Sequence, residues 1–386
     1  MSKKWLLTRR GLLCLGLGTL ASIGTLAKSK ALNNQARDFT VVGEASLKER
    51  AAAKGLIYGA AAKYRTLSSD TEFAVRFPQE CAILAPENDL KWRGLRPSRD
   101  RFDFTKSDWL VEFAYTNNML LQGHTLVWHN GLPQWFKEKV NRQNAERMLI
   151  DHIKKVAGHY AGKMHSWDVV NEAVYPTHGR ANGLRNSPWL ELLDSDYIEL
   201  AFHVAREADP QALLVYNENH LWYEGQLRPN TPTGEAKRTA VLKLLERLKS
   251  RGTPIDVLGI QGHLRGHQLD QLNPKKLRAF LTNVADLDLK IMITELDVRD
   301  HRLPKDINVR DRLVAKAYED FLSVVLDEPA VMAVITWGLS DRDTWLSKFA
   351  RRKDGLPVRP LPLDDQLNRK LAWNAIARAF DNAPMR

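Results

Sequence analysis

Short apolar runs recur along most of the chain, and each of them ends in polar residues. Eight of the runs have the length of buried strands rather than of helices. They span residues 55–61, 81–88, 119–125, 166–172, 213–218, 257–263, 290–295 and 331–337. The runs begin about 39 residues apart on average, which leaves room for one helix and two loops between successive strands.

Helical patterns lie between these predicted strands. Residues 241–248 place Val or Leu at the i, i+3, i+4 and i+7 positions of one helix face, and residues 313–325 carry a second such stripe. Residues 106–118 and 144–160 are similar but less regular. Eight alternations of strand and helix predict an α/β fold, a (β/α)8 TIM barrel forming a single catalytic domain. A doubly wound open sheet is the alternative, but it would more often show a glycine-rich phosphate loop after its first strand.

The first 31 residues have the features of an export signal. They contain six Lys or Arg and no acidic residue, and the apolar run 11–27 is shorter than the ~20 residues of a spanning helix. Residues 8–13 resemble the twin-arginine motif, and a general secretory signal is the alternative. We therefore expect a secreted or periplasmic protein with no membrane attachment after signal removal. The domain prediction is a signal at 1–31, a lead-in at 32–54 and a catalytic domain at 55–380.

Composition narrows the possible functions. The chain has 386 residues, of which 44% are hydrophobic and 27% charged, as in ordinary globular proteins. The net charge of +11 falls to +5 without the signal, so the sequence gives little support for nucleic-acid binding, and none is expected. Only Cys81 remains after loss of Cys14, so no internal disulfide can form. There is no Cys-x-x-Cys or His-Glu-x-x-His motif, and we expect no metal site.

Polar residues collect where the predicted strands end, which is where TIM barrels carry their functional side chains. They are carboxylates, amides, imidazoles, a lysine and indoles: Glu87, Asn88, Lys91, His124, Trp128, His129, Asn171, Glu172, Asn217, Glu218, Gln261, His263, Glu295, Asp297 and Trp337. Amides and carboxylates bind hydroxyl groups, and indoles stack on sugar rings, so the set suits a sugar polymer. Glycoside hydrolysis needs two carboxyl groups, and the residues alone leave five candidates open: Glu87, Glu172, Glu218, Glu295 and Asp297.

Six motifs in register resemble glycoside hydrolase family 10, the retaining endo-1,4-β-xylanases. The first five are Pro-Glu-Asn-Asp-Leu-Lys-Trp at 86–92, Gly-His-Thr-Leu-Val-Trp-His at 123–129, Trp-Asp-Val-Val-Asn-Glu-Ala at 167–173, Gly-Ile-Gln-Gly-His-Leu at 259–264 and Ile-Thr-Glu-Leu-Asp-Val at 293–298. The sixth is Trp-Gly-Leu-Ser-Asp at 337–341, followed by Trp345. The resemblance runs from about residue 55 to residue 380.

The resemblance implies roles for particular residues. Glu172 would be the acid/base and Glu295 the nucleophile, and Asn171 would bind the 2-hydroxyl of the sugar at the cleavage point. The other substrate-binding residues would be Glu87, Asn88 and Lys91 on the glycone side, His124 and Trp128 at the cleavage site, Gln261 and His263 beside the nucleophile, and Trp337 and Trp345 as walls. No cofactor is implied. The expected partner is xylan or xylo-oligosaccharides, and we expect a monomer.

The implied mechanism is a double displacement through a covalent glycosyl-enzyme, which requires carboxyl groups roughly 5–5.5 Å apart. The charge of Glu295 is then expected to raise the pKa of Glu172. Two alternatives remain open: an enzyme acting on another β-1,4 glycan such as a glucan, and a glycan-binding protein without catalysis. Crowding by Asn88, Trp337 and Trp345 near the position of the glucose hydroxymethyl group would decide between xylan and glucan.

Some residues near the motifs are expected to have structural roles. Trp92, Trp167 and Phe104 are predicted in the core, and Asp297 is predicted to support His263. His129 is either a hydrogen-bonding neighbour of the site or a binding residue. Four positions depart from the family pattern: Glu218 and Asn219, where Asp-Tyr is commoner, and Arg342 and Asp343, where Lys-Tyr is commoner. The sequence therefore does not predict the shape of the loops that contain these positions.

Overall fold

The computed structural model describes residues 37–386. The export signal predicted at residues 1–31 lies outside the described residues, as does the beginning of the lead-in. The described part contains nine parallel strands: β1 (Ile57–Ala62), β2 (Ile83–Pro86), β3 (Leu120–Trp128), β4 (Ser166–Asn171), β5 (Leu213–Glu218), β6 (Val257–Ile260), β7 (His263–Arg265), β8 (Lys290–Arg299) and β9 (Val331–Thr336).

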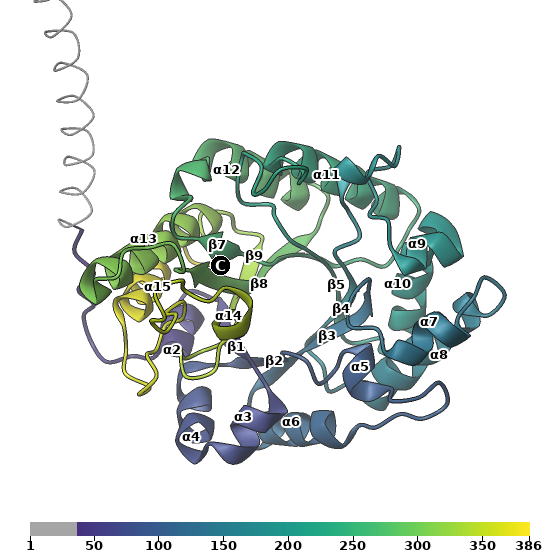
Figure 1. The fold of residues 1–386 in the computed structure, drawn as a ribbon, viewed down its shortest axis with the longest axis horizontal. Helices are drawn as coiled ribbons and strands as arrows, with labels where there is room; N and C mark the ends of the chain where they lie inside the picture. Colours follow the sequence, from purple (N-terminus) through teal and green to yellow (C-terminus); the bar gives the residue numbers. More distant parts are fainter. Residues whose placement is uncertain (1–36) are drawn as a thin grey trace, which may run out of the picture.

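Eight of these strands close into a barrel. Each pairs in parallel with its neighbours in the order β1 to β6, β8 and β9, and the pairing of β1 with β9 completes the ring. Figure 1 shows the strands around the centre and the helices outside them. The predicted (β/α)8 TIM barrel is therefore confirmed, and the open doubly wound sheet is wrong.

The sixth predicted strand, 257–263, is interrupted in the structure. It forms β6 and then, after Gln261 and Gly262, the separate short strand β7, which pairs only with the far end of β8. Gly262 has φ +74°, a left-handed conformation that β strands do not contain and that glycine adopts at little cost. This turn changes the direction of the chain, so that Gln261 and His263 both line the cavity described below.

Helices cover the outside of the barrel. They are α2 (Leu47–Ala52), α3 (Tyr64–Ser69), α4 (Thr71–Glu80), α5 (Trp92–Leu95), α6 (Thr105–Thr116), α7 (Gln134–Lys139), α8 (Ala145–His159), α9 (Pro188–Leu193), α10 (Tyr197–Ala208), α11 (Gly234–Ser250), α12 (Pro274–Ala285), α13 (Ile307–Val325), α14 (Leu346–Phe349) and α15 (Leu371–Asn382). The four predicted helical segments correspond to α6, α8, α11 and α13. None of the described helices combines the length and the hydrophobicity that crossing a membrane requires.

Two hydrophobic cores hold the fold. The larger one fills the layer between strands and helices and includes all four apolar residues of the 241–248 stripe, whereas Leu313 of the second stripe is only partly buried. Trp92 and Trp167 are buried in this layer, and Phe104 packs against it while partly exposed. The smaller core fills the inside of the barrel with residues such as Ile83, Met292 and Ile335. Trp337 belongs to this inner core, which the cavity overlies.

Candidate active site

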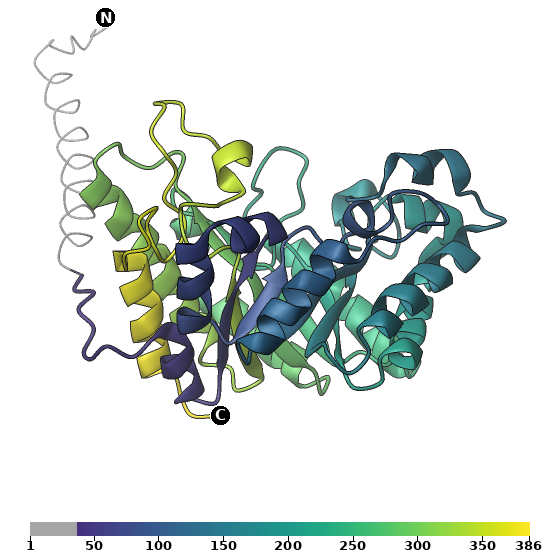
Figure 2. The same ribbon diagram turned by 90° about the horizontal axis from the view of Figure 1, so that it is seen from below.

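The carboxyl ends of the barrel strands meet at one rim, where they line a cavity of about 480 Å3. Figure 2 shows the loop that carries α14 standing above this rim. All twelve residues predicted to be catalytic or substrate-binding line the cavity: Glu87, Asn88, Lys91, His124, Trp128, Asn171, Glu172, Gln261, His263, Glu295, Trp337 and Trp345. Six segments of sequence thus contribute to one site, because parallel strands present all their carboxyl ends at the same rim.

Glu172 directly follows β4 and has φ +58°, an unusual left-handed conformation for a residue with a side chain. Such backbone conformations cost energy and gather at functional sites. Gln261 Nε2 donates a hydrogen bond of 3.0 Å to Oε1 of Glu172. Oε2 of Glu172 has two longer contacts, with Arg185 Nη2 at 3.7 Å and with His129 Nε2 at 3.8 Å.

The surroundings of Glu172 contradict the expected direction of its pKa shift. Burial raises the pKa of this carboxyl group, but the positive charge of Arg185, together with His129 and the hydrogen bond from Gln261, outweighs burial and lowers the pKa to about 2. The sequence prediction considered only the neighbouring carboxylate. Arg185 comes from the loop after β4 and also donates a 2.6 Å hydrogen bond from Nε to the backbone oxygen of Glu172.

Glu295 lies within β8 and is held at both carboxylate oxygens. Asn217 Nδ2 donates to Oε1 at 2.9 Å, and His263 Nε2 lies 3.0 Å from Oε2. The amide of Asn217 is itself oriented by Thr294, whose hydroxyl donates to Oδ1 at 2.7 Å. Glu295 is only 5% exposed, so these contacts replace water as the partners of its charge.

His263 stands between two carboxylates. Its Nδ1 is 3.0 Å from Oδ1 of Asp297, a fully buried residue that also accepts a 2.7 Å hydrogen bond from Trp345 Nε1. Burial opposes a charge on the imidazole, yet Asp297 and Glu295 together raise the pKa of His263 to about 9. At neutral pH the ring is therefore positively charged, donates from Nε2 to Glu295 and forms an ion pair through Nδ1 with Asp297.

A chain of polar contacts occupies the opposite part of the cavity. Asn88 Nδ2 donates to Oε1 of Glu87 at 3.0 Å, and Lys91 Nζ donates to Oδ1 of Asn88 at 3.3 Å. Lys63 pairs with Glu87 at 3.4 Å. Burial raises the pKa of Glu87 and lowers that of Lys91. Lys91 Nζ also lies 5.1 Å from the centre of the Trp128 ring, a cation–π distance.

Two further contacts hold the side chains that form the cavity wall at β3 and β9. His124 Nδ1 lies 2.7 Å from Oδ2 of the buried Asp168, and the His124 ring meets Trp337 edge-on with centroids 5.1 Å apart. Trp128 Nε1 is buried without a hydrogen-bond partner among the described residues, so a sugar hydroxyl could accept from it.

Three residues of this site escaped the sequence reasoning. Arg185 was not considered at all, Asp168 appeared only as a letter of a motif, and Asn217 was noted at a strand end without a role. Asp168 and Asn217 lie on strands and point inward, so the period of two along β4 and β5 could have found them. Arg185 lies in an irregular loop, 13 residues after Glu172, where no periodicity exists.

The four positions that depart from the family pattern all contact the scaffold, and Asn219 does so by accepting a 3.2 Å hydrogen bond from Lys237. Glu218 forms a fully buried 2.8 Å ion pair with Lys237. Arg342 pairs with Asp70 at 3.0 Å, and Asp343 pairs with Lys63 at 2.5 Å. Because Lys63 also contacts Glu87, Asp343 links the loop after β9 to the carboxylate chain of the cavity.

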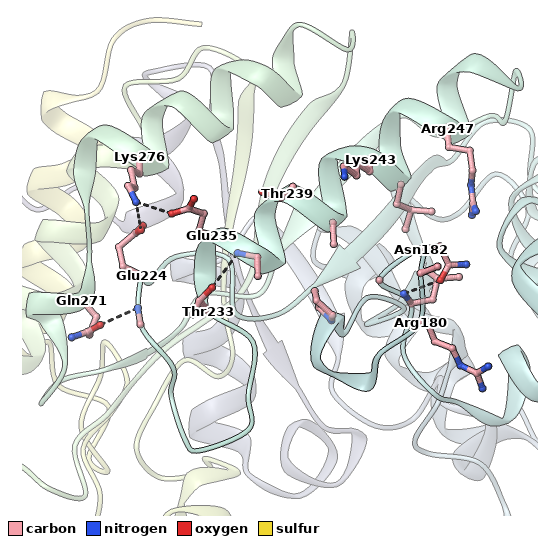
Figure 3. Close-up of a pocket in the computed structure, with 18 residues that line it drawn as sticks. Arg180, Asn182, Glu224, Thr233, Glu235, Thr239, Lys243, Arg247, Gln271 and Lys276 are labelled. Atoms are coloured by element: carbon pink, nitrogen blue, oxygen red, sulfur yellow. Dashed lines mark hydrogen bonds and ion pairs between the residues drawn. The ribbon is translucent and has the colours of Figure 1, made fainter.

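A larger cavity, of about 990 Å3, lies away from this rim between α11, the segment 176–184 and the loop after β5. Lys276 in its lining pairs with Glu224 at 3.2 Å and with Glu235 at 2.9 Å, as Figure 3 shows. It contains none of the twelve predicted residues. Among residues 37–386 no three His, Cys, Asp or Glu side chains are grouped as a bound metal ion would need.

Comparisons with known proteins agree on one family. The model of glycosyl hydrolase family 10 matches residues 46–379, a range that contains the whole cavity. Endo-1,4-beta-xylanase B of Thermotoga neapolitana is 34% identical over 306 residues, which make up 78% of this chain and 82% of that protein. The crystal structure of native xylanase 10B from Thermotoga maritima is similar with a TM-score of 0.76 and 35% identity, over 87% of this chain and 98% of that one. Xylanase 10B from Thermotoga petrophila RKU-1 in complex with xylobiose gives 0.77 and 34%, over 89% and 99%.

Proposed function

The chain belongs to glycosyl hydrolase family 10, and from this premise we propose that it is an endo-1,4-β-xylanase that cleaves xylan with retention of configuration. The observation that carries the proposal is the placement of two glutamates, the partly exposed Glu172 after β4 and the buried Glu295 in β8, in one cavity at the barrel rim. The likeness to a xylanase that binds xylobiose supports xylo-oligosaccharides as ligands.

In the proposed mechanism Glu295 is the nucleophile. Its carboxylate attacks the anomeric carbon while the bond to the leaving sugar oxygen breaks, which forms a covalent glycosyl ester. The hydrogen bond from Asn217 and the charged ring of His263 fix the direction of the Glu295 carboxylate. Preorganised donors of this kind need no rearrangement during the reaction.

Glu172 is the proposed acid/base. It gives a proton to the leaving oxygen in the first step and takes one from the attacking water in the second. Its pKa of about 2 in the free protein means that it must gain its proton as substrate binds. A sugar placed over Glu172 removes water from the carboxyl group, and desolvation favours the neutral form.

One experiment separates the two roles. Glu295→Gln should lower activity about 10⁴-fold or more on xylan and on an aryl xylobioside alike, because no covalent intermediate can form. Glu172→Ala should keep a fast first step on the aryl substrate, whose leaving group needs little protonation, and should accumulate the intermediate. A phenol burst, an added disaccharide mass and rescue by azide with a β-azide product are the expected readouts. Equal losses in both variants, with no rescue, would contradict the assignment.

Two controls accompany this experiment. Glu146→Gln changes the same groups on the exposed face of α8 and should leave the rates unchanged. Initial rates on xylan and on carboxymethyl cellulose test the alternative of a glucan-degrading enzyme, and absence of turnover on both would favour a glycan-binding protein. Xylan is preferred in the proposal because the chain is similar to endo-1,4-beta-xylanases and to a xylanase in complex with xylobiose.

We also propose that the protein is exported, on the strength of the basic and apolar pattern of residues 1–31 alone. The mature chain should begin between Lys28 and Asn33, which N-terminal sequencing of protein from outside the cytoplasm can measure. Replacing Arg9 and Arg10 by lysine should block export by the twin-arginine route. Unchanged export of that variant would favour the general secretory route.

A further inference from the structure

A second pocket, of about 930 Å3, opens directly from the proposed xylan cavity. The two share part of their lining, namely Leu227, Arg228, Arg265, Arg299 and Phe349. The pocket lies over the loops that follow β5, β7, β8 and β9. In the closed ring β6 is four strands from β2 in either direction, so this pocket lies across the barrel from Glu87, Asn88 and Lys91.

The pocket is strongly basic. Eight of its lining residues are Arg or Lys, two more are His267 and His301, and its one acidic residue is Asp354. Asp354 is already paired with Arg352 at 2.6 Å. The remaining cationic side chains therefore have no acidic partner in the lining.

Seven of the eight Arg and Lys residues in the lining are unpaired: Arg228, Arg265, Arg299, Arg302, Lys305, Arg351 and Lys353. Among residues 37–386 none of the seven lies within ion-pair distance of a carboxylate, whereas Arg352 in the same lining pairs with Asp354. Among the described residues, Arg299 Nε and both ring nitrogens of His267 are buried without a hydrogen-bond partner. Buried donors without partners are uncommon in proteins and require an explanation.

Mutual repulsion among the cations is visible in their pKa values. Burial, followed by the charges of Arg299 and Arg228, lowers the pKa of Arg265 to about 10. Burial and then Arg302 lower the pKa of His267 to about 4. The 990 Å3 cavity on α11 differs, because Lys276 there is neutralised by Glu224 and Glu235 (Figure 3). An anion from outside the chain would relieve the repulsion in the basic pocket.

The pocket also contains an apolar aromatic surface on which a sugar ring can stack. Phe349 is 58% exposed within the lining, and its ring stacks on Trp345 with centroids 4.7 Å apart. The guanidinium of Arg299 lies over both rings, at 5.2 and 5.1 Å from their centres. A ring with an apolar face and an attached anion matches this combination.

We propose that this basic pocket binds the carboxylate of a uronic acid carried by the xylan chain, and that the enzyme thereby favours acidic, glucuronic-acid-branched xylan over neutral xylan. The proposal rests on the proposed xylanase function. The basic pocket opens from the glycan cavity, and the same arginines line both. A carboxylate attached to the bound glycan can therefore reach these arginines, which favours it over a free anion. Planar guanidinium groups bind carboxylates with two parallel hydrogen bonds.

The test compares kcat/KM on glucuronic-acid-branched xylan and on neutral linear xylohexaose. We expect the wild type to favour the acidic substrate, with a preference that falls several-fold between 20 and 200 mM salt, since exposed ion pairs are screened. The double variant Arg302→Gln/Arg351→Gln changes pocket residues that do not line the cavity. It should lower the rate on acidic xylan about tenfold and on xylohexaose less than twofold.

Two further variants make the outcome decisive. Arg302→Lys with Arg351→Lys keeps both charges and should retain most of the preference. Arg147→Gln on the exposed face of α8 removes a remote charge and should change nothing. Equal loss on both substrates, or no preference in the wild type at low salt, would overturn the carboxylate site. A wild type inactive on xylohexaose as well would instead contradict the proposed function.

Discussion

Glu172 and Glu295 lie at the same rim, Glu295 buried and Glu172 partly exposed, and they are held in different ways. Strand residues fix Glu295, since Asn217 is in β5 and His263 in β7, and their contacts are 2.9 and 3.0 Å long. Glu172 has one such contact, from Gln261, and two looser ones from Arg185 and His129, at 3.7 and 3.8 Å. Short contacts therefore fix the orientation of Glu295, whereas most contacts of Glu172 are longer.

This difference fits the two proposed tasks. A nucleophile needs one direction and one charge state, which short contacts from strands provide. An acid/base changes its protonation twice in a cycle, and rigid cationic contacts would trap it in its charged form. The comparison teaches that the strand scaffold sets the geometry of Glu295, while a loop residue, Arg185, sets the charge balance at Glu172.

The largest effect is expected from the buried pair that anchors the Glu172 side. Lys237 pairs with Glu218 and donates to the backbone oxygen of Val174, which ties the segment after Glu172 to β5 and α11. Lys237→Met leaves Glu218 buried without a counter-charge and should lower the free energy of unfolding by about 3–5 kcal/mol. Urea unfolding measures this change. Lys243→Met, exposed on the same helix, should stay within about 0.5 kcal/mol, and a similarly small loss for Lys237→Met would refute the anchoring role.

A smaller but specific effect is expected on the Glu295 side. Asp297→Asn removes the main group that raises the pKa of His263, so burial should bring this pKa from about 9 to near or below 6.5. The imidazole then loses its charge as pH rises through that range, and kcat/KM on an aryl xylobioside at pH 8 should fall about 100-fold. Below pH 6 the loss should be smaller, because His263 regains its proton.

Two measurements check this prediction. The pH profile of kcat/KM should acquire a new alkaline limb between pH 6 and 7 in Asp297→Asn, and NMR titration should assign that limb to the His263 ring. The same raised pKa predicts that His263 stabilises the wild type fully below pH 6.5 and ceases to do so as pH rises through about 9. Asp270→Asn, exposed in the loop after β7, is the matched control. An unchanged profile in Asp297→Asn would separate Asp297 from the charge of His263.

Regular elements were predictable from the sequence, and the irregular ones were not. Apolar periodicity located all eight barrel strands within a few residues, because a parallel strand must be apolar on both faces. It missed the break at Gly262, since residues on both sides of the turn are those of a strand. The twelve site residues were accessible because barrel topology brings strand ends together in any such sequence.

The electrostatic balance of the site was not predictable from the sequence. The expected rise in the pKa of Glu172 considered one carboxylate in a pair, whereas the structure adds Arg185, His129 and Gln261 around it. Those contacts come from loops whose path follows no repeating pattern. The unpaired state of Arg265 and Arg299 was equally hidden, because a charge in the sequence does not reveal whether a partner lies nearby.

The smallest expected effect tests the loop side of the comparison most directly. Arg185→Gln removes the largest influence that lowers the pKa of Glu172, while the Gln amide can still donate to the backbone oxygen of Glu172. The pKa of Glu172 should rise by about one unit. Since the first step needs protonated Glu172 and this proton is gained as substrate binds, the alkaline limb of kcat, which reports the enzyme–substrate complex, should move up by about one pH unit.

The readout separates charge from packing. Loss of packing alone would lower kcat at every pH without moving the limb, whereas loss of the charge moves the limb and raises kcat on its alkaline side about tenfold. Arg185→Lys keeps the charge and should leave the limb near the wild-type position. Arg180→Gln, exposed on the same loop, should behave as the wild type. A limb that stays in place in Arg185→Gln would show that the charge state of Glu172 is set by its own strand after all, and the contrast with Glu295 would disappear.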